Sequence, residues 1–140
     1  MASYVKFHQF VKDLGLGVHN FSSHTLKVML TNTAPSQSNA VKADITEISA
    51  GNGYTAGGIA VTVSSWDQSS GTGKLVLADA TWTATGTMAT FRYVVLYNDS
   101  PTSPADPLIA YWDYGSAVTL LLGETFTWDA DPTTGVFTVV

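Results

Sequence analysis

The sequence contains no cysteine, which excludes disulfide bonds and metal sites built from thiolates. A chain of 140 residues does not need such cross-links, because a domain of this length can bury a hydrophobic core of its own. The lack of cysteine is typical of proteins that fold in a reducing cytoplasm. We therefore expect a cytoplasmically made protein whose stability comes from one apolar core.

Charged residues are also scarce. Only 12% of the residues are charged, and Lys and Arg together number six. Such a chain cannot neutralise a run of phosphates, so no nucleic-acid partner is expected. Lys6, His8 and Lys12 interrupt the segment where the apolar core of a signal peptide would lie, and no apolar run approaches the length of a membrane span. We expect neither a secretion signal nor contact with a membrane.

Catalytic motifs are missing as well. The three histidines, His8, His19 and His24, all lie near the N-terminus, and no serine stands in a G-x-S-x-G motif. The glycines do not follow a nucleotide-binding pattern, and the acidic residues of 129–135 do not have the spacing of a calcium loop. We expect no enzymatic activity, no cofactor and no metal site. The histidines are expected at the surface or in an interface.

The residues that are present favour strands. The chain is 45% hydrophobic and 11% aromatic, and it is rich in threonine and valine. Alternating apolar residues and turn signals predict about eight strands. They fall at 24–30, 59–66, 74–85, 88–97, 108–114, 118–122, 125–128 and 136–140, and the last two are expected to form a closing hairpin. This pattern predicts an all-β fold, an antiparallel two-sheet β-sandwich with jelly-roll-like topology ahead of an immunoglobulin-like one.

The segment 44–66 is the most distinctive part of the sequence. Asp44 and Glu47 have the spacing of a capping box, which predicts one short helical turn opening at Asp44. Glycines at positions 51, 53, 57 and 58 then predict a connection whose backbone adopts conformations that other residues avoid. The segment leads into the strand predicted at 59–66.

Residues 1–21 are predicted to form a short amphipathic helix or an extended arm in front of a β-sandwich domain at 22–140. The apolar residues from Phe7 to Leu14 have the spacing of one helical face, with Ser3 as a possible cap and Gly15 and Gly17 at the end. A helix this short needs a partner surface to be stable, which is supplied either by its own domain or by another protein. Our hypothesis is that residues 1–21 are an interface element. Its predicted contact residues are Tyr4, Lys6, Phe7, Phe10, Val11, Lys12 and Leu14.

Charge is distributed unevenly along the chain. Up to position 42 there are four lysines and one acidic residue, whereas six acidic residues and no basic one follow Arg92. This pattern fits ordinary solvation of an acidic surface, or a basic N-terminal arm that docks on an acidic surface of a neighbour. The dipeptide Trp-Asp, at 66–67, 112–113 and 128–129, is expected at strand ends. The tryptophans and tyrosines are expected in the core and interfaces, with a carbohydrate platform as the alternative.

Three stretches resemble small structural proteins from the head-gene region of tailed bacteriophages, the capsid decoration or cement proteins. They are L-K-V-M-L-T-N-T-A-P at 26–35, D-I-T-E-I-S-A-G-N-G-Y-T-A-G-G at 44–58 and W-D-A-D-P-T-T-G-V-F at 128–137. The resemblance implies a virion component, made in the cytoplasm of a bacterial host, that binds the outside of a shell of major capsid protein. It also implies reinforcement of contacts between capsid subunits and self-association as a dimer or trimer. No catalytic residues come with it.

Two alternatives stay open. One is a tail-associated or fibre-associated virion protein with a receptor-binding or glycan-binding role, which predicts that ligand quenches exposed tryptophans. The other is a non-viral β-sandwich adhesion domain, for which a secretion signal would be expected.

Overall fold

The structure is a computed structural model that describes residues 3–140, and strands dominate it. The strands are β1 (Ser3–Lys6), β2 (Leu26–Thr31), β3 (Ile59–Val61), β4 (Val63–Ser69), β5 (Thr72–Leu77), β6 (Ala80–Thr83), β7 (Phe91–Asn98), β8 (Leu108–Val118), β9 (Thr125–Trp128) and β10 (Phe137–Val139). One α-helix, α1 (His8–Gly15), and one 3₁₀ turn, η1 (Lys42–Asp44), complete the described elements.

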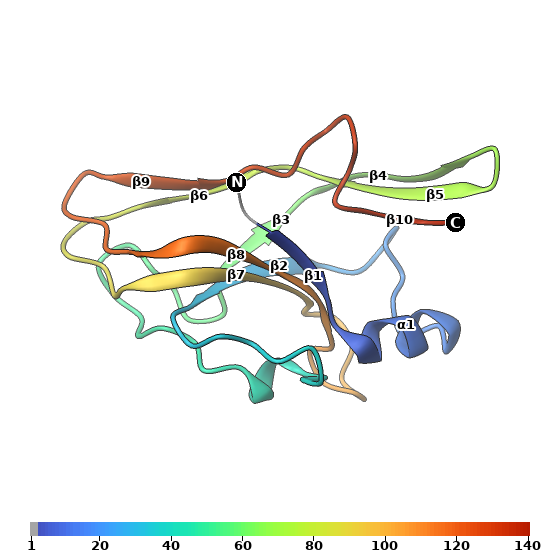
Figure 1. Cartoon of the computed structure of the whole chain (residues 1–140), viewed down its shortest axis with the longest axis horizontal. Helices are drawn as coiled ribbons and strands as arrows, with labels where there is room; N and C mark the ends of the chain where they lie inside the picture. Colours follow the sequence, from blue (N-terminus) through green and yellow to red (C-terminus); the bar gives the residue numbers. More distant parts are fainter. Residues whose placement is uncertain (1–2) are drawn as a thin grey trace.

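The strands pair antiparallel in three sheets. The largest has the order β1-β8-β7-β2-β3, and the smaller ones have the orders β10-β5-β4 and β6-β9. Figure 1 shows both smaller sheets on the same side of the large one. Thr62 alone separates β3 from β4, so the chain passes directly from the large sheet into a smaller one. The predicted all-β, antiparallel class is confirmed, whereas the two-sheet sandwich with jelly-roll-like topology stays a prediction.

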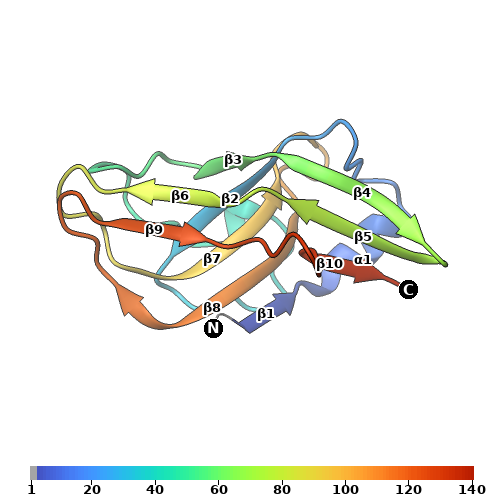
Figure 2. The ribbon, with the colours of Figure 1, turned by 90° about the horizontal axis from the view of Figure 1, so that it is seen from above.

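The hydrophobic core centres on β7 and its neighbours β2 and β8. Residues 94–98 of β7 are buried on both faces, as the apolar run at 88–97 predicts. The alternating residues Leu26, Val28 and Leu30 of β2 are fully buried beside them. A central strand buried on both faces needs cover on both sides. The smaller sheets cover one face, as the view from above shows (Figure 2).

The glycine segment closes the edge of β2 beyond the end of β3. The Ile48 amide donates to the Leu30 carbonyl (3.1 Å), and the Leu30 amide donates to the Tyr54 hydroxyl (3.2 Å). These bonds satisfy backbone groups that a sheet edge would otherwise leave unpaired. A segment without regular secondary structure therefore supplies the hydrogen bonds that a neighbouring strand would supply to β2.

The helical turn of this segment lies one turn earlier than its capping box predicts. It spans Lys42–Asp44, and Asp44 stands at its end. The Asp44 carboxylate accepts hydrogen bonds from the backbone amides of Ala40 (2.9 Å) and Val41 (3.2 Å). These bonds lower the pKa of Asp44. Glu47, the other half of the predicted box, binds Tyr54 and Gly57 instead.

The N-terminal residues belong to the same folded unit as the sheets, which corrects the expected boundary at residue 21. Residues 3–6 pair with β8, with Tyr4 opposite Trp112, and α1 begins at His8 rather than after Ser3. Phe7 is 0% exposed and Phe10 is 1% exposed. The helical spacing identified the buried face, but this face packs on the chain's own core. Residues 1 and 2 of the predicted arm lie outside the described residues.

The prediction of a closing hairpin is wrong. β9 pairs with β6, and β10 pairs with β5. Only residues 78–79 separate β5 from β6, so these two strands offer one nearly continuous edge. The chain from β9 to β10 follows this edge instead of folding back on itself.

A substitution at Gly58 tests how closely the backbone of the glycine segment approaches β2. The φ of Gly58 is +82°, and a Cβ at this position would overlap the Val28 carbonyl oxygen of β2. We expect Gly58→Ala to lower the free energy of unfolding by about 2–4 kcal/mol, because the strain and the steric overlap add. Urea denaturation measures the change. Gly15→Ala is the matched control: Gly15 ends α1 with nothing within 4 Å of its Cβ position, so its effect should stay within about 1 kcal/mol of zero.

Candidate binding groove

A groove of about 510 Å³ opens between β8 and the chain that leads from β9 into β10. Its volume falls in the range of sites that hold small molecules or the anchoring side chains of a partner. The lining residues are Val94, Trp112, Tyr114, Phe126, Thr127, Trp128, Asp129, Ala130, Asp131, Pro132, Thr134, Gly135 and Val136.

Four aromatic rings from two strands form the inner surface of the groove. Trp112 and Tyr114 stand two residues apart on β8, and Phe126 and Trp128 stand two apart on β9, so each pair faces one side of its strand. Trp112 meets Trp128 edge-to-face with 5.0 Å between ring centroids, and Tyr114 meets Phe126 at 5.3 Å. Edge-to-face contacts fix the orientation of each ring.

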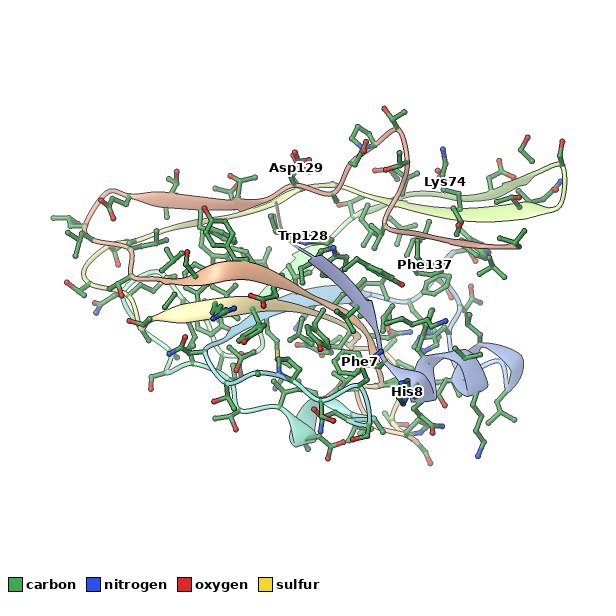
Figure 3. All side chains as sticks on the ribbon, viewed as in Figure 1. Phe7, His8, Lys74, Trp128, Asp129 and Phe137 are labelled. Carbon is green, nitrogen blue, oxygen red and sulfur yellow. The ribbon has the colours of Figure 1, made fainter. Side chains whose placement is uncertain are left out.

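The rings differ in how far a ligand can reach them. Trp128 is only 5% exposed, whereas Tyr114 is 46% exposed. Figure 3 shows the Trp128 side chain pointing between the layers and the neighbouring Asp129 pointing away from them. The groove therefore has an aromatic interior and an acidic rim, with Tyr114 as its most accessible ring among these.

Hydrogen bonds hold the loop at the rim in one conformation. The Asp131 carboxylate accepts from the Thr133 amide (2.8 Å), the Thr134 amide (3.3 Å) and the Thr134 hydroxyl (2.7 Å). The Thr134 hydroxyl and these two amides lower the pKa of Asp131, so the carboxylate stays ionised. Lys74 of β5 donates to the Thr133 carbonyl (2.9 Å). A loop that is ordered before the ligand arrives loses less entropy on binding.

Two further residues shape the rim. The Asp129 side chain is exposed at the rim, where its carboxylate can accept a hydrogen bond from a donor on a ligand. Tyr4 of β1 packs edge-on against Trp112 with 5.5 Å between centroids and is 40% exposed. Tyr4 thus extends the aromatic surface beyond the groove.

The predicted interface residues are divided by the fold. Tyr4 contacts a ring of the groove, and Lys6, Val11 and Lys12 are exposed elsewhere. Leu14 is half-buried against the core. Phe7 and Phe10 are core residues and are not accessible to a partner in this conformation, because they fill space between α1 and the sheets.

The groove was not predicted from the sequence, although a partial signal is present. The patterns W-x-Y at 112–114 and F-x-W at 126–128 place aromatic residues on one face of two strands. The Trp-Asp dipeptides are a further signal, since two of the three, at 112–113 and 128–129, lie at the groove. Only the pair at 128–129 stands at a strand end. Those at 66–67 and 112–113 lie within β4 and β8, where Asp113 forms a two-point ion pair with Arg92 (2.8 and 3.1 Å).

The histidines also differ from expectation. His8 is exposed, but His19 and His24 converge on Asn98 at the end of β7. Within residues 3–140, no group of three or more His, Cys, Asp or Glu side chains is arranged to hold a metal ion. In the same range, no helix combines the length and apolar character that a membrane span requires.

A scan against protein-family models, a search of curated proteins and a search of solved structures found no match to this chain.

The exposed fraction of each aromatic side chain indicates its role in the groove. A buried ring such as Trp128 supports the fold, whereas an exposed ring such as Tyr114 can contact a ligand. We expect Trp128→Ala to lower the free energy of unfolding by about 3–5 kcal/mol, because it removes a buried ring. Tyr114→Ala should cost no more than about 1 kcal/mol, because much of its ring already faces water. Denaturant unfolding of both variants checks this. Equal losses would show that Tyr114 is a structural residue.

Proposed function

We propose that this chain is a structural virion protein that binds the outer surface of a tailed-phage capsid and reinforces contacts between major capsid protein subunits. The proposal combines the resemblance at 26–35, 44–58 and 128–137 with one structural observation, the aromatic groove and its acidic rim. The third stretch of the resemblance forms most of one wall of that groove.

The groove suits a protein contact. Buried aromatic anchors and ordered polar rims are the features that concentrate binding energy in protein interfaces. A protein repeated over a shell does not need a tight individual contact, because many moderate ones in fixed geometry add through avidity. A jelly-roll-like sandwich, location on the capsid exterior and self-association as a dimer or trimer belong to the same proposal.

Charged side chains that are not paired within the fold indicate which surfaces could contact a partner. Lys27 pairs with Asp99 (3.0 Å), Lys42 with Glu47 (3.7 Å) and Arg92 with Asp113 (2.8 Å), so much of the charge asymmetry along the sequence is used within the fold. The acidic rim of the groove and the exposed lysines of α1 and β1 are the charged groups that we assign to partner contacts.

The groove also favours a second candidate, a tail-associated or fibre-associated virion protein that binds glycans. Aromatic faces pack on the apolar faces of sugars, and a carboxylate such as Asp129 accepts hydrogen bonds from sugar hydroxyls. This candidate predicts attachment to host cells or tails, and quenching of tryptophan fluorescence by soluble glycan.

Binding to capsids tests the first proposal. The protein is mixed with purified shells that lack it, sedimented, and counted against the major capsid protein. We expect saturable binding at a fixed ratio and shells that are harder to disrupt. Tyr114→Ala should weaken binding about tenfold or more, as loss of an exposed aromatic anchor does.

Leu122→Ala is the control, because Leu122 is 74% exposed on the turn before β9 and does not line the groove. It should bind as the wild type does. Failure of the wild-type protein to bind shells would reject the capsid proposal, and attachment to tails or cells would support the second candidate. Binding that Tyr114→Ala leaves unchanged would move the contact to another surface.

A further inference from the structure

Asn98, at the end of β7, is fully buried and connects two histidines that come from a distant part of the sequence. Its side-chain nitrogen lies 3.0 Å from Nδ1 of His19 and 2.9 Å from Nδ1 of His24. Its side-chain oxygen accepts a hydrogen bond from the Ser100 amide (3.2 Å). That bond fixes the orientation of the Asn98 amide, so its nitrogen must be the group that faces the rings.

This arrangement determines the protonation of both histidines. An amide nitrogen can only donate, so each Nδ1 must accept, and each ring is neutral with its proton on Nε2. The backbone amide of Asn20 also donates to Nδ1 of His24 (3.2 Å), which supports the same tautomer. Protonation of either Nδ1 would place two donors face to face.

The surroundings of His19 keep its ring neutral. The ring stacks on Phe21 with 5.7 Å between centroids and meets Phe10 edge-on at 5.2 Å. Burial lowers the pKa of His19 to about 4. The nearby Asp13 opposes this shift, and His24 adds to it. In the part of the chain that the structure describes, His19 Nε2 and Asp13 Oδ2 are buried without a hydrogen-bond partner.

We propose that Asn98, His19 and His24 form a pH-sensitive latch that holds residues 8–24 on the sheets. The latch joins the loop after α1 to the end of β7, and Phe10 and Phe21 lie behind it in the core. When a histidine is protonated, its hydrogen bond to Asn98 is lost, and a positive charge then faces the buried amide of Asn98. Opening the latch would bring Phe10 and Phe21 toward solvent.

The charged groups around the latch act in both directions. Asp13 of α1 favours the protonated form of His19, and His24 disfavours it. Lys27 and Asp99 lie beside it on β2 and directly after β7, but they neutralise each other at 3.0 Å. Since the pKa in the folded state is below the unfolded value, the contribution of His19 to stability is complete above about pH 6.5 and is lost as the pH falls toward 4.

Unfolding at two pH values tests the latch. Between pH 7.5 and 4.5, a histidine whose pKa rises from about 4 to 6.5 on unfolding increases the unfolding equilibrium constant about 70-fold. We expect the wild type to lose about this factor more than His19→Gln. The control His8→Gln should behave as the wild type, because His8 is exposed. Equal pH dependence in the wild type and His19→Gln would overturn the proposal.

A second variant distinguishes a latch from a merely buried histidine. Asn98→Asp replaces the donor that faces both rings with an acceptor, so it should raise the pKa of His19 above its wild-type value. NMR titration of the His19 ring signals measures this pKa, and it also reports whether Nε2 carries the proton in the wild type. The wild-type His19 should titrate well below pH 6.5. A normal wild-type pKa, or an unchanged one in a folded Asn98→Asp variant, would reject the latch.

Discussion

The hydrogen bonds of Glu47 are the constraint on which the edge of the large sheet depends. One carboxylate oxygen accepts from the Tyr54 hydroxyl (2.6 Å) and from the Gly57 amide (2.5 Å). Tyr54 in turn accepts from Leu30, so a single acidic side chain links the glycine segment to β2. Burial, together with the bond to Glu47, raises the pKa of Tyr54 and keeps its hydroxyl available as a donor. These hydrogen bonds hold the irregular segment against β2, where it pairs with backbone groups beyond the end of β3.

The sequence allows the elements to be predicted better than their partners. The alternation in β2 and the long apolar run in β7 identify strands, because side-chain periodicity is local. Which strands pair with each other depends on residues far apart in the sequence. β9 pairs with β6, although β10 is nearer to β9 in the sequence. The same limit explains α1: spacing revealed that Phe10 faces apolar surroundings but not that its own domain supplies them. The groove joins β8 to β9, and the histidine cluster joins the loop after α1 to the end of β7. The sequence shows which residue types are present, but it does not show that these segments meet.

The groove and the histidine cluster place different demands on the same scaffold. In the groove, edge-to-face contacts between rings of β8 and β9 fix the orientation of the aromatic side chains that line it. At the cluster, a buried amide fixes the protonation of two rings and closes the surface. The groove lies mainly on β8 and the cluster at the end of β7, and these two strands pair with each other from Phe91–Val118 to Tyr97–Leu108. Two neighbouring strands of the large sheet therefore contribute to the groove that we propose as a binding surface and to the histidine cluster that we propose as a latch.

The passage of the chain from β3 to β4 has a mechanical consequence. Because one residue separates these strands, the large sheet and a smaller one share a continuous backbone rather than a slack loop. A force that pulls the large sheet away from the smaller one would act directly on the hydrogen bonds of β2–β3 and of β4–β5. The single residue between β3 and β4 leaves no loop that could straighten first. Load would be spread over two sets of hydrogen bonds, which is a useful property in any protein that must transmit tension between the surfaces it joins.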